Sequence, residues 1–123
     1  MIFLKIFLVG AGGFLGAILR YEASERMKGW MNGDFPWGTY TVNLLGSFLL
    51  GFLIGRDTPP LVLLFAGTGL MGAFTTFSTF KFEAVKLLAQ EKRITFYVYL
   101  TFSYAGGLFF AFTGLKLGQW FVY

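Results

Sequence analysis

Three long runs of this sequence carry no charged residue, and their length limits the fold more than any other feature. They cover residues 35–55, 58–80 and 94–115. A helix needs about 20 mostly apolar residues to cross the hydrocarbon core of a bilayer, so each run is long enough to span one. A fourth run, residues 6–19, is shorter. It reaches a spanning length only if Lys5 extends toward the headgroups and Arg20 is tolerated near its other end.

The composition supports a bilayer as the solvent. Only 13% of the residues are charged and 56% are hydrophobic, whereas a soluble domain has about 25% charged residues. The runs do not alternate between apolar and polar residues as barrel strands do, so helices are the remaining way to satisfy the backbone in lipid. We expect an all-α membrane protein with a single domain, residues 1–123. Its four transmembrane helices are predicted at approximately residues 3–26, 36–56, 59–89 and 94–120.

Several functions are disfavoured by what the sequence lacks. It has no Cys and no His, which removes thiol chemistry, most zinc sites and the usual general base. It also has no phosphate-binding GxxxxGK[ST] motif. The net charge of +4 comes from basic residues that flank the apolar runs, so it indicates control of membrane topology rather than nucleic-acid binding. We therefore expect neither an enzyme nor a nucleic-acid partner.

The basic residues are nearly balanced between the two ends of the predicted helices. With four spans, both termini and the second connection share one side. That side holds Lys5, Arg56 and Lys116, and the other holds Arg26, Lys28, Lys92 and Arg93. The sequence does not fix the depth of Arg20, Lys81 and Lys86, which are left out of this count. Since the Lys and Arg bias sets orientation, the balance leaves two alternatives. The chain inserts in both orientations, so that oppositely inserted copies can pair, or a finer count of the loops would reveal one orientation.

Two polar residues stand out in the first two spans. Asn43 lies in the middle of the second span, with Ser47 one turn later on the same face. A buried amide there needs a partner, which is either another helix or an ion in a pore. Arg20 lies within or at the edge of the first span. It either caps that helix at the interface or has a function, because an Arg at membrane depth is costly.

The third span contains the segment "GTGLMGAFTTFSTF", residues 67–80. Gly and Thr are poor helix formers, so we expect a helix break at residues 72–76. Unwound carbonyls at such a break commonly bind a cation. After the break, Phe77 and Phe80 share a helix face, whereas Ser78 and Thr79 lie elsewhere on the helix.

The Phe residues allow two interpretations. A Phe in a membrane helix usually faces lipid or the protein core. Alternatively, the positive edge of its ring can face an anion. A pathway for a small, strongly hydrated anion must replace lost water hydrogen bonds with donors such as Asn, Ser and Thr. It should also avoid a fully exposed cation, which would hold the ion too tightly for passage. The uncharged, hydroxyl-rich composition of the third span meets these conditions without naming the ion.

Three segments together resemble a known family, the CrcB/Fluc fluoride channels. They are "GGFLGAILRY", "GTYTVNLLGSFLLG" and "GAFTTFSTF", at residues 12–21, 38–51 and 72–80. The resemblance extends over the whole chain. It implies a multi-pass protein of the cell inner (plasma) membrane that forms a dual-topology antiparallel homodimer. Two pores, each built from both subunits, would let fluoride leave the cell passively and so confer fluoride resistance.

The resemblance also implies roles for particular residues. The fluoride pore would use a pore Asn, Phe ring edges and hydroxyls, matched here by Asn43, Phe77, Phe80, Ser78, Thr79, Ser103 and Tyr104. A broken third helix would hold a structural Na⁺ at the dimer interface through the backbone carbonyls of Gly72 and Thr75. Arg20 matches the Arg that ends the first segment and is expected to be structural or to lie in a vestibule.

Two other functions were compared with the channel. A small dual-topology multidrug exporter driven by protons needs a titratable carboxylate in mid-membrane. Glu83 is the candidate, and it lies among bases in "KFEAVK", which indicates an interfacial position. A non-transporting membrane adaptor would conduct nothing and would give Asn43 and the two Phe residues no special role.

Overall fold

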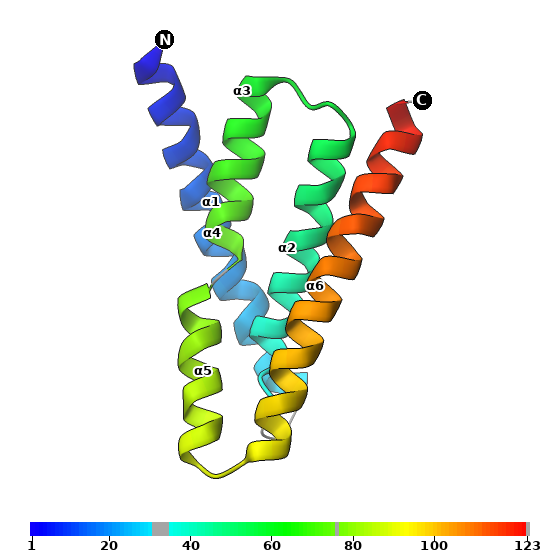
Figure 1. Ribbon diagram of the computed structural model, residues 1–123. Coiled ribbons are helices and arrows are strands. Elements are labelled where there is room, and N and C mark those ends of the chain that lie inside the picture. The colour runs from blue at the N-terminus through cyan, green and yellow to red at the C-terminus, as the bar shows by residue number, and fades with distance from the viewer. Residues whose placement is uncertain (31–34, 76, 123) are drawn as a thin grey trace.

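The described residues of this chain form helices joined by short connections. A computed structural model describes residues 1–30, 35–75 and 77–122; the side chains of residues 28–30, 77, 78 and 122 are not described. In chain order the elements are α1 (Ile2–Trp30), α2 (Trp37–Gly55), α3 (Pro60–Val62), η1 (Leu63–Met71), α4 (Gly72–Phe74), α5 (Phe77–Ala89) and α6 (Arg93–Val122). The element η1 is a π-helix that continues from α3 and leads into α4 (Figure 1).

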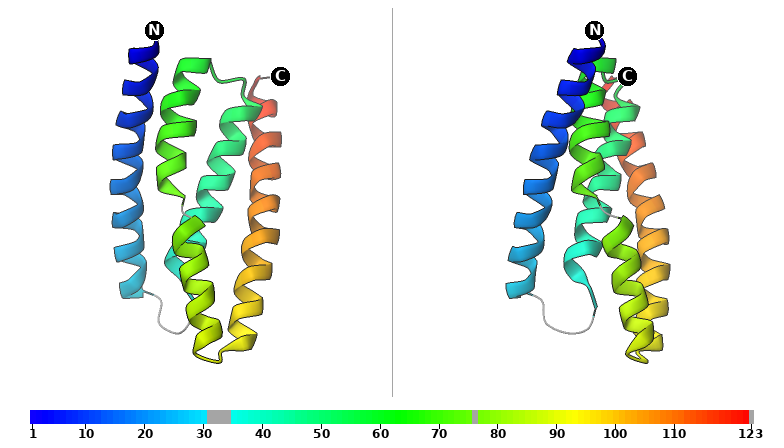
Figure 2. Two further views of the ribbon diagram at one scale, coloured as in Figure 1. Left: turned by 60° about the vertical axis from the view of Figure 1, so that its left-hand side comes forward. Right: turned by 90° about the vertical axis from the view of Figure 1, so that its left-hand side faces the viewer.

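Four segments of the described residues are long and apolar enough to cross a membrane. They are Ile2–Met27, Trp37–Gly55, Pro60–Ala89 and Arg93–Phe121. The prediction of an all-helical chain with four candidate membrane-spanning helices is therefore confirmed. Both termini and the α2–α3 connection lie at one end of the bundle, and the α5–α6 turn lies at the other (Figures 1 and 2). We call these the terminal end and the turn end.

Glycine residues allow α2 and α6 to pack with their backbones in contact. A Cβ built on Gly51 would overlap the carbonyl oxygen of Ala111, and one on Gly55 would overlap that of Leu115. From the other side, Gly114 and Gly118 face the carbonyls of α2 in the same way. The spacing of small residues four apart is what permits such close approach of membrane helices. Together these residues hold α6 against α2 over several turns.

A second glycine pair holds α1 against the third segment. Gly12 and Gly16 face the backbone of η1, where a Cβ would overlap the carbonyl oxygens of Phe65 and Leu70. Runs of π-helix are rare and commonly occur at functional sites. The nine-residue η1 packs its backbone against α1. Its residues Gly67, Thr68 and Met71 also line a cavity.

The helical backbone does not continue through Thr75. This residue caps α4 in an extended conformation, with φ −79° and ψ 158°. Its amide and its hydroxyl both donate to the Met71 carbonyl, at 3.0 Å and 2.9 Å. Thr76 lies outside the described residues, and α5 begins at Phe77. Two buried clusters lie on either side of this point, Val42–Met71–Phe74 and Phe80–Ala84–Leu87–Tyr99.

Most of the apolar surface of the outer helices is not covered by this chain. Only 11% of the most apolar stretch of α1, and the same share of α6, is buried. Large aromatic side chains such as Phe109 and Phe112 are more than half exposed. Exposed apolar surface on this scale is compatible with lipid or with another protein surface, and not with water.

Candidate functional site

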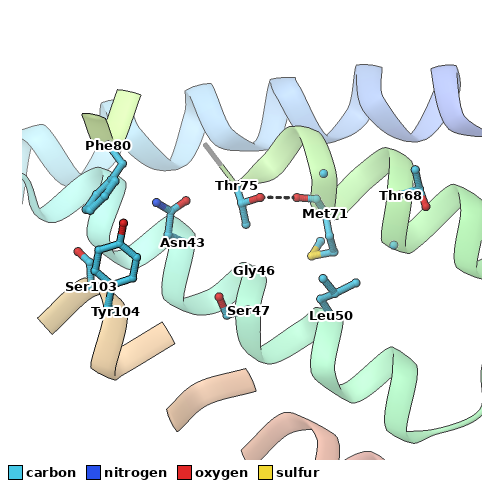
Figure 3. Close-up of a pocket in the computed structure, with 12 residues that line it drawn as sticks. Asn43, Gly46, Ser47, Leu50, Thr68, Met71, Thr75, Phe80, Ser103 and Tyr104 are labelled. Carbon is cyan, nitrogen blue, oxygen red and sulfur yellow. Dashed lines mark hydrogen bonds between the residues drawn. The ribbon is translucent and has the colours of Figure 1, made fainter. Parts of the chain in front are cut away.

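A cavity of about 530 Å³ lies between α2, the third segment and α6. Its lining residues are Asn43, Gly46, Ser47, Leu50, Gly67, Thr68, Met71, Gly72, Thr75, Phe80, Ser103 and Tyr104. Figure 3 shows that it follows α2, with Phe80 and Tyr104 toward one end and Leu50 and Thr68 toward the other. We call it the central cavity. None of its described lining residues carries a charge.

The central cavity brings together many of the residues that the sequence singled out. Asn43 from α2, Phe80 from α5, and Ser103 and Tyr104 from α6 all line it. Gly72 and Thr75, the two residues expected to supply carbonyl ligands, also line it. Residues separated by up to 61 positions in the sequence therefore share one uncharged space.

Phe80 is held in place by two tyrosine rings. It is only 6% exposed. The ring of Tyr104 is perpendicular to it with a centroid separation of 5.7 Å, and the ring of Tyr99 is tilted by 49° at 5.1 Å. The Tyr104 contact is edge-to-face, which is a favourable arrangement for two aromatic rings. The Phe80 ring thus has a defined direction at one end of the cavity (Figure 3).

Tyr99 is a candidate hydrogen-bond donor for the ion that the sequence analysis did not identify. It is fully buried, and in the described part of the chain neither its hydroxyl nor that of Ser103 has a hydrogen-bond partner. The two residues are four apart on α6 and so lie one turn apart on one face. This four-residue spacing from Ser103 could have identified Tyr99 as a pore residue from the sequence. Tyr104 was instead matched to the pore because it is next to Ser103 in the sequence. Tyr104 lines the cavity but is 59% exposed.

Other predicted residues lie elsewhere. Thr79 lines a second cavity and not the central one. Arg20, on α1, lines neither of the two cavities described. The side chains of Phe77 and Ser78 lie outside the described residues, so their positions relative to the central cavity are not assigned.

The second cavity, of about 600 Å³, lies at the turn end. It is more polar than the central cavity, with Thr79, Glu83, Lys86 and Lys92 among its lining residues. Glu83 accepts a hydrogen bond from the hydroxyl of the buried Thr39. A carboxylate that is hydrogen-bonded and close to lysines is well suited to a hydrated entrance.

The comparisons with known proteins agree with the three segments recognised in the sequence. A family model described as "CrcB-like protein, Camphor Resistance (CrcB)" matches residues 7–115. The chain belongs to the CrcB family. A relative from Bacillus cereus, named "Fluoride-specific ion channel FluC 2", is 48% identical over 115 residues, which cover 94% of this chain and 98% of that protein.

Further relatives have equally informative names. A protein from Listeria monocytogenes, "Fluoride-specific ion channel FluC 1", is 47% identical over 90% of this chain and 94% of its own length. One of the same name from Geobacillus kaustophilus is 46% identical over 90% of this chain and 95% of its own length. These names describe ion channels, and neither enzymes nor exporters. The CrcB match contains all three recognised segments.

Proposed function

We propose that this chain is a fluoride-selective passive ion channel that exports cytoplasmic fluoride down its electrochemical gradient. The observation that carries the proposal is the uncharged central cavity, where Asn43, Phe80 and Ser103 converge. The names of the relatives supply the ion. The cavity supplies the chemistry that such an ion requires.

The donors at the cavity suit a small anion. An Asn amide has two N–H donors, and each Ser or Tyr hydroxyl has one. The Ser103 hydroxyl lines the cavity, has no partner among the described residues, and can donate to an ion without breaking a bond inside the chain. The unpartnered Tyr99 hydroxyl belongs to a residue one turn away on α6 that does not line the cavity, and we assign it as a further donor. The edge of the Phe80 ring adds a weaker positive contact. Because none of the described lining residues is a cation, the ion is solvated without being trapped.

The remaining site residues extend this pathway. We assign Phe77 and Ser78 to the pore because they share α5 with Phe80. Thr79, Glu83 and the lysines of the second cavity form its entrance at the turn end. Arg20 is assigned to structure or to a vestibule on the strength of the family match alone.

The complete channel is proposed to be an antiparallel homodimer with two pores, each built from both copies. The exposed apolar faces of α1 and α6 leave room for a second copy as well as lipid. The third segment is interrupted at Thr75 beside the central cavity. This interruption is the proposed meeting point of the two copies.

A structural Na⁺ at that interface fits the residues present. Hard cations take oxygen ligands, and the described residues contain no cluster of three or more His, Cys, Asp or Glu for a metal. The Gly72 and Thr75 carbonyls both belong to cavity-lining residues, and Thr75 departs from helical geometry. These two carbonyls would hold the ion, which would fix the two copies against each other.

Export of the anion requires no ATP hydrolysis and no coupled ion gradient. In the inner (plasma) membrane, the negative interior potential drives a monovalent anion outward by about 2.3 kcal/mol per 100 mV. Fluoride enters acid-exposed cells as the neutral acid and ionises inside. A passive pore is therefore sufficient to empty the cell of the anion.

The direct test is fluoride efflux from liposomes that contain the purified protein, read with a fluoride electrode beside a chloride electrode. Protein-free liposomes are the control. Rapid fluoride loss with little chloride loss is expected. A folded protein that releases neither ion would contradict the proposed channel and favour the adaptor, whereas equal release of both would contradict fluoride selectivity.

A further inference from the structure

The central cavity continues beyond the residues so far assigned to the ion. From Asn43 it follows α2 past Ser47 to Leu50, with Thr68 of η1 on the facing wall (Figure 3). An anion that leaves Asn43 and Ser103 in this direction, toward the terminal end, moves away from Phe80. It needs another donor, because a desolvated anion without hydrogen bonds is costly.

The helix α6 supplies no hydroxyl at this point. The face that carries Tyr99 and Ser103 continues one turn later with Gly107, which has no side chain. A Cβ built on Gly107 would lie 3.8 Å from the Oγ of Ser47, at ordinary contact distance. The Ser47 hydroxyl of α2 thus lies against the bare backbone where a side chain of α6 would project.

We propose that the Ser47 hydroxyl is the next hydrogen-bond donor for the conducted anion after Asn43 and Ser103, and that Gly107 leaves the space for it. The inference rests on the proposed channel function and adds a residue to its pathway. The path then changes helices: α6 provides the hydroxyls near Phe80, and α2 provides the one beyond Asn43.

The experiment compares fluoride efflux for the wild-type chain, Ser47→Ala, and two double variants. Ser47→Ala should lower the efflux rate about tenfold, the effect of losing one hydrogen bond to a charged group. Ser47→Ala with Gly107→Ser returns a hydroxyl to the same space from α6 and should recover most of the rate. Ser47→Ala with Gly107→Ala adds only a methyl group and should not.

The controls separate the hydroxyl from packing. Thr113→Ala removes an exposed hydroxyl of α6 that donates to the Phe109 carbonyl and should leave efflux at the wild-type rate. Each variant is first checked for an unchanged elution volume in size-exclusion chromatography. If Ser47→Ala aggregates, Ser47→Cys keeps nearly the same volume with a weaker donor and should also slow efflux.

The outcomes are distinct for the two proposals. Wild-type efflux from the Ser47 variants, or equal rates for the two double variants, would overturn the donor role while leaving the channel intact. Absence of fluoride efflux from the wild-type chain itself would overturn the channel proposal and this inference together.

Discussion

At the scale of single residues, Phe80 combines a packing role with a proposed contact to the ion. Its ring is buried among Ala84, Leu87 and Tyr99, and it also lines the central cavity. A substitution therefore has to be judged by two measurements. One is the stability of the folded protein, and the other is the rate of ion passage.

Phe80→Ile should slow fluoride efflux at least about tenfold, because Ile has no ring edge to offer an anion. Loss of the buried ring should lower the free energy of unfolding by only about 1–2 kcal/mol, so the assembled protein should persist. Phe82→Ile, on the exposed face of the same helix, is the matched control. Wild-type efflux from a folded Phe80→Ile variant would exclude the ring-edge mechanism.

Tyr99→Phe tests the residue that the structure added. The hydroxyl has no partner among the described residues, so its removal should leave thermal stability unchanged or raise it. Efflux should nevertheless fall about tenfold if the hydroxyl donates to the ion. Tyr97→Phe, at a position that is 62% exposed on the same helix, should retain full activity. An active Tyr99→Phe variant would limit Tyr99 to packing against Phe80.

At the scale of elements, the packing of α2 on α6 positions the cavity. Asn43 and Ser47 come from one helix, and Ser103 comes from the other. The glycines at residues 51, 55, 114 and 118 remove side chains from this interface, so the two backbones set the rotation of both helices. A larger residue there should disturb the cavity without touching it.

Gly51→Leu should separate α2 from α6, because its Cβ would overlap the Ala111 carbonyl oxygen. Overpacking of this kind costs about 1–3 kcal/mol or more. The variant should elute as aggregate or unfold at a lower temperature, measured by chromatography and by thermal unfolding in detergent. Gly10→Leu, where a Cβ meets nothing within 4 Å, should behave as wild type. Equal stability of the two variants would contradict close packing at Gly51.

At the scale of the whole molecule, the distribution of basic residues bears on how the chain is oriented in the membrane. The helix α5 lies in the turn-end half of the bundle, and so do Lys81 and Lys86 (Figure 1). Arg20 is closer in sequence to Trp30, the last residue of α1, than to Ile2 at the terminal end. Counting these three, the turn end has seven basic residues and the terminal end has three. All three lie within candidate membrane spans, so they do not replace the count of the connections, and insertion in both orientations stays a prediction.

A single introduced cysteine measures the orientation, since the chain has no native Cys. Asp57→Cys marks the terminal end and Lys92→Cys the turn end. Each should be about half labelled by a membrane-impermeant thiol reagent on intact cells if antiparallel homodimers form. Full labelling after permeabilisation is the control. Labelling of Asp57→Cys alone would show one orientation and contradict an antiparallel pair of identical chains.

The sequence by itself determined that the chain is helical, that it has four spans, and which short segments carry polar groups. The number of spans follows from the length of the apolar runs, and helicity follows from the need to satisfy backbone hydrogen bonds in lipid. Span length and backbone hydrogen bonding are both local properties of the chain. Residues 12–21, 38–51 and 72–80 were sufficient to recognise the family.

Only the tertiary structure decided which polar groups share a space. It brought Tyr99 against Phe80, directed Thr79 into the second cavity, and set Ser47 against Gly107. The rotation of each helix about its own axis decides such neighbours. That rotation depends on backbone contacts between helices far apart in the sequence, such as Gly51 with Ala111, and no local pattern in a single helix contains it.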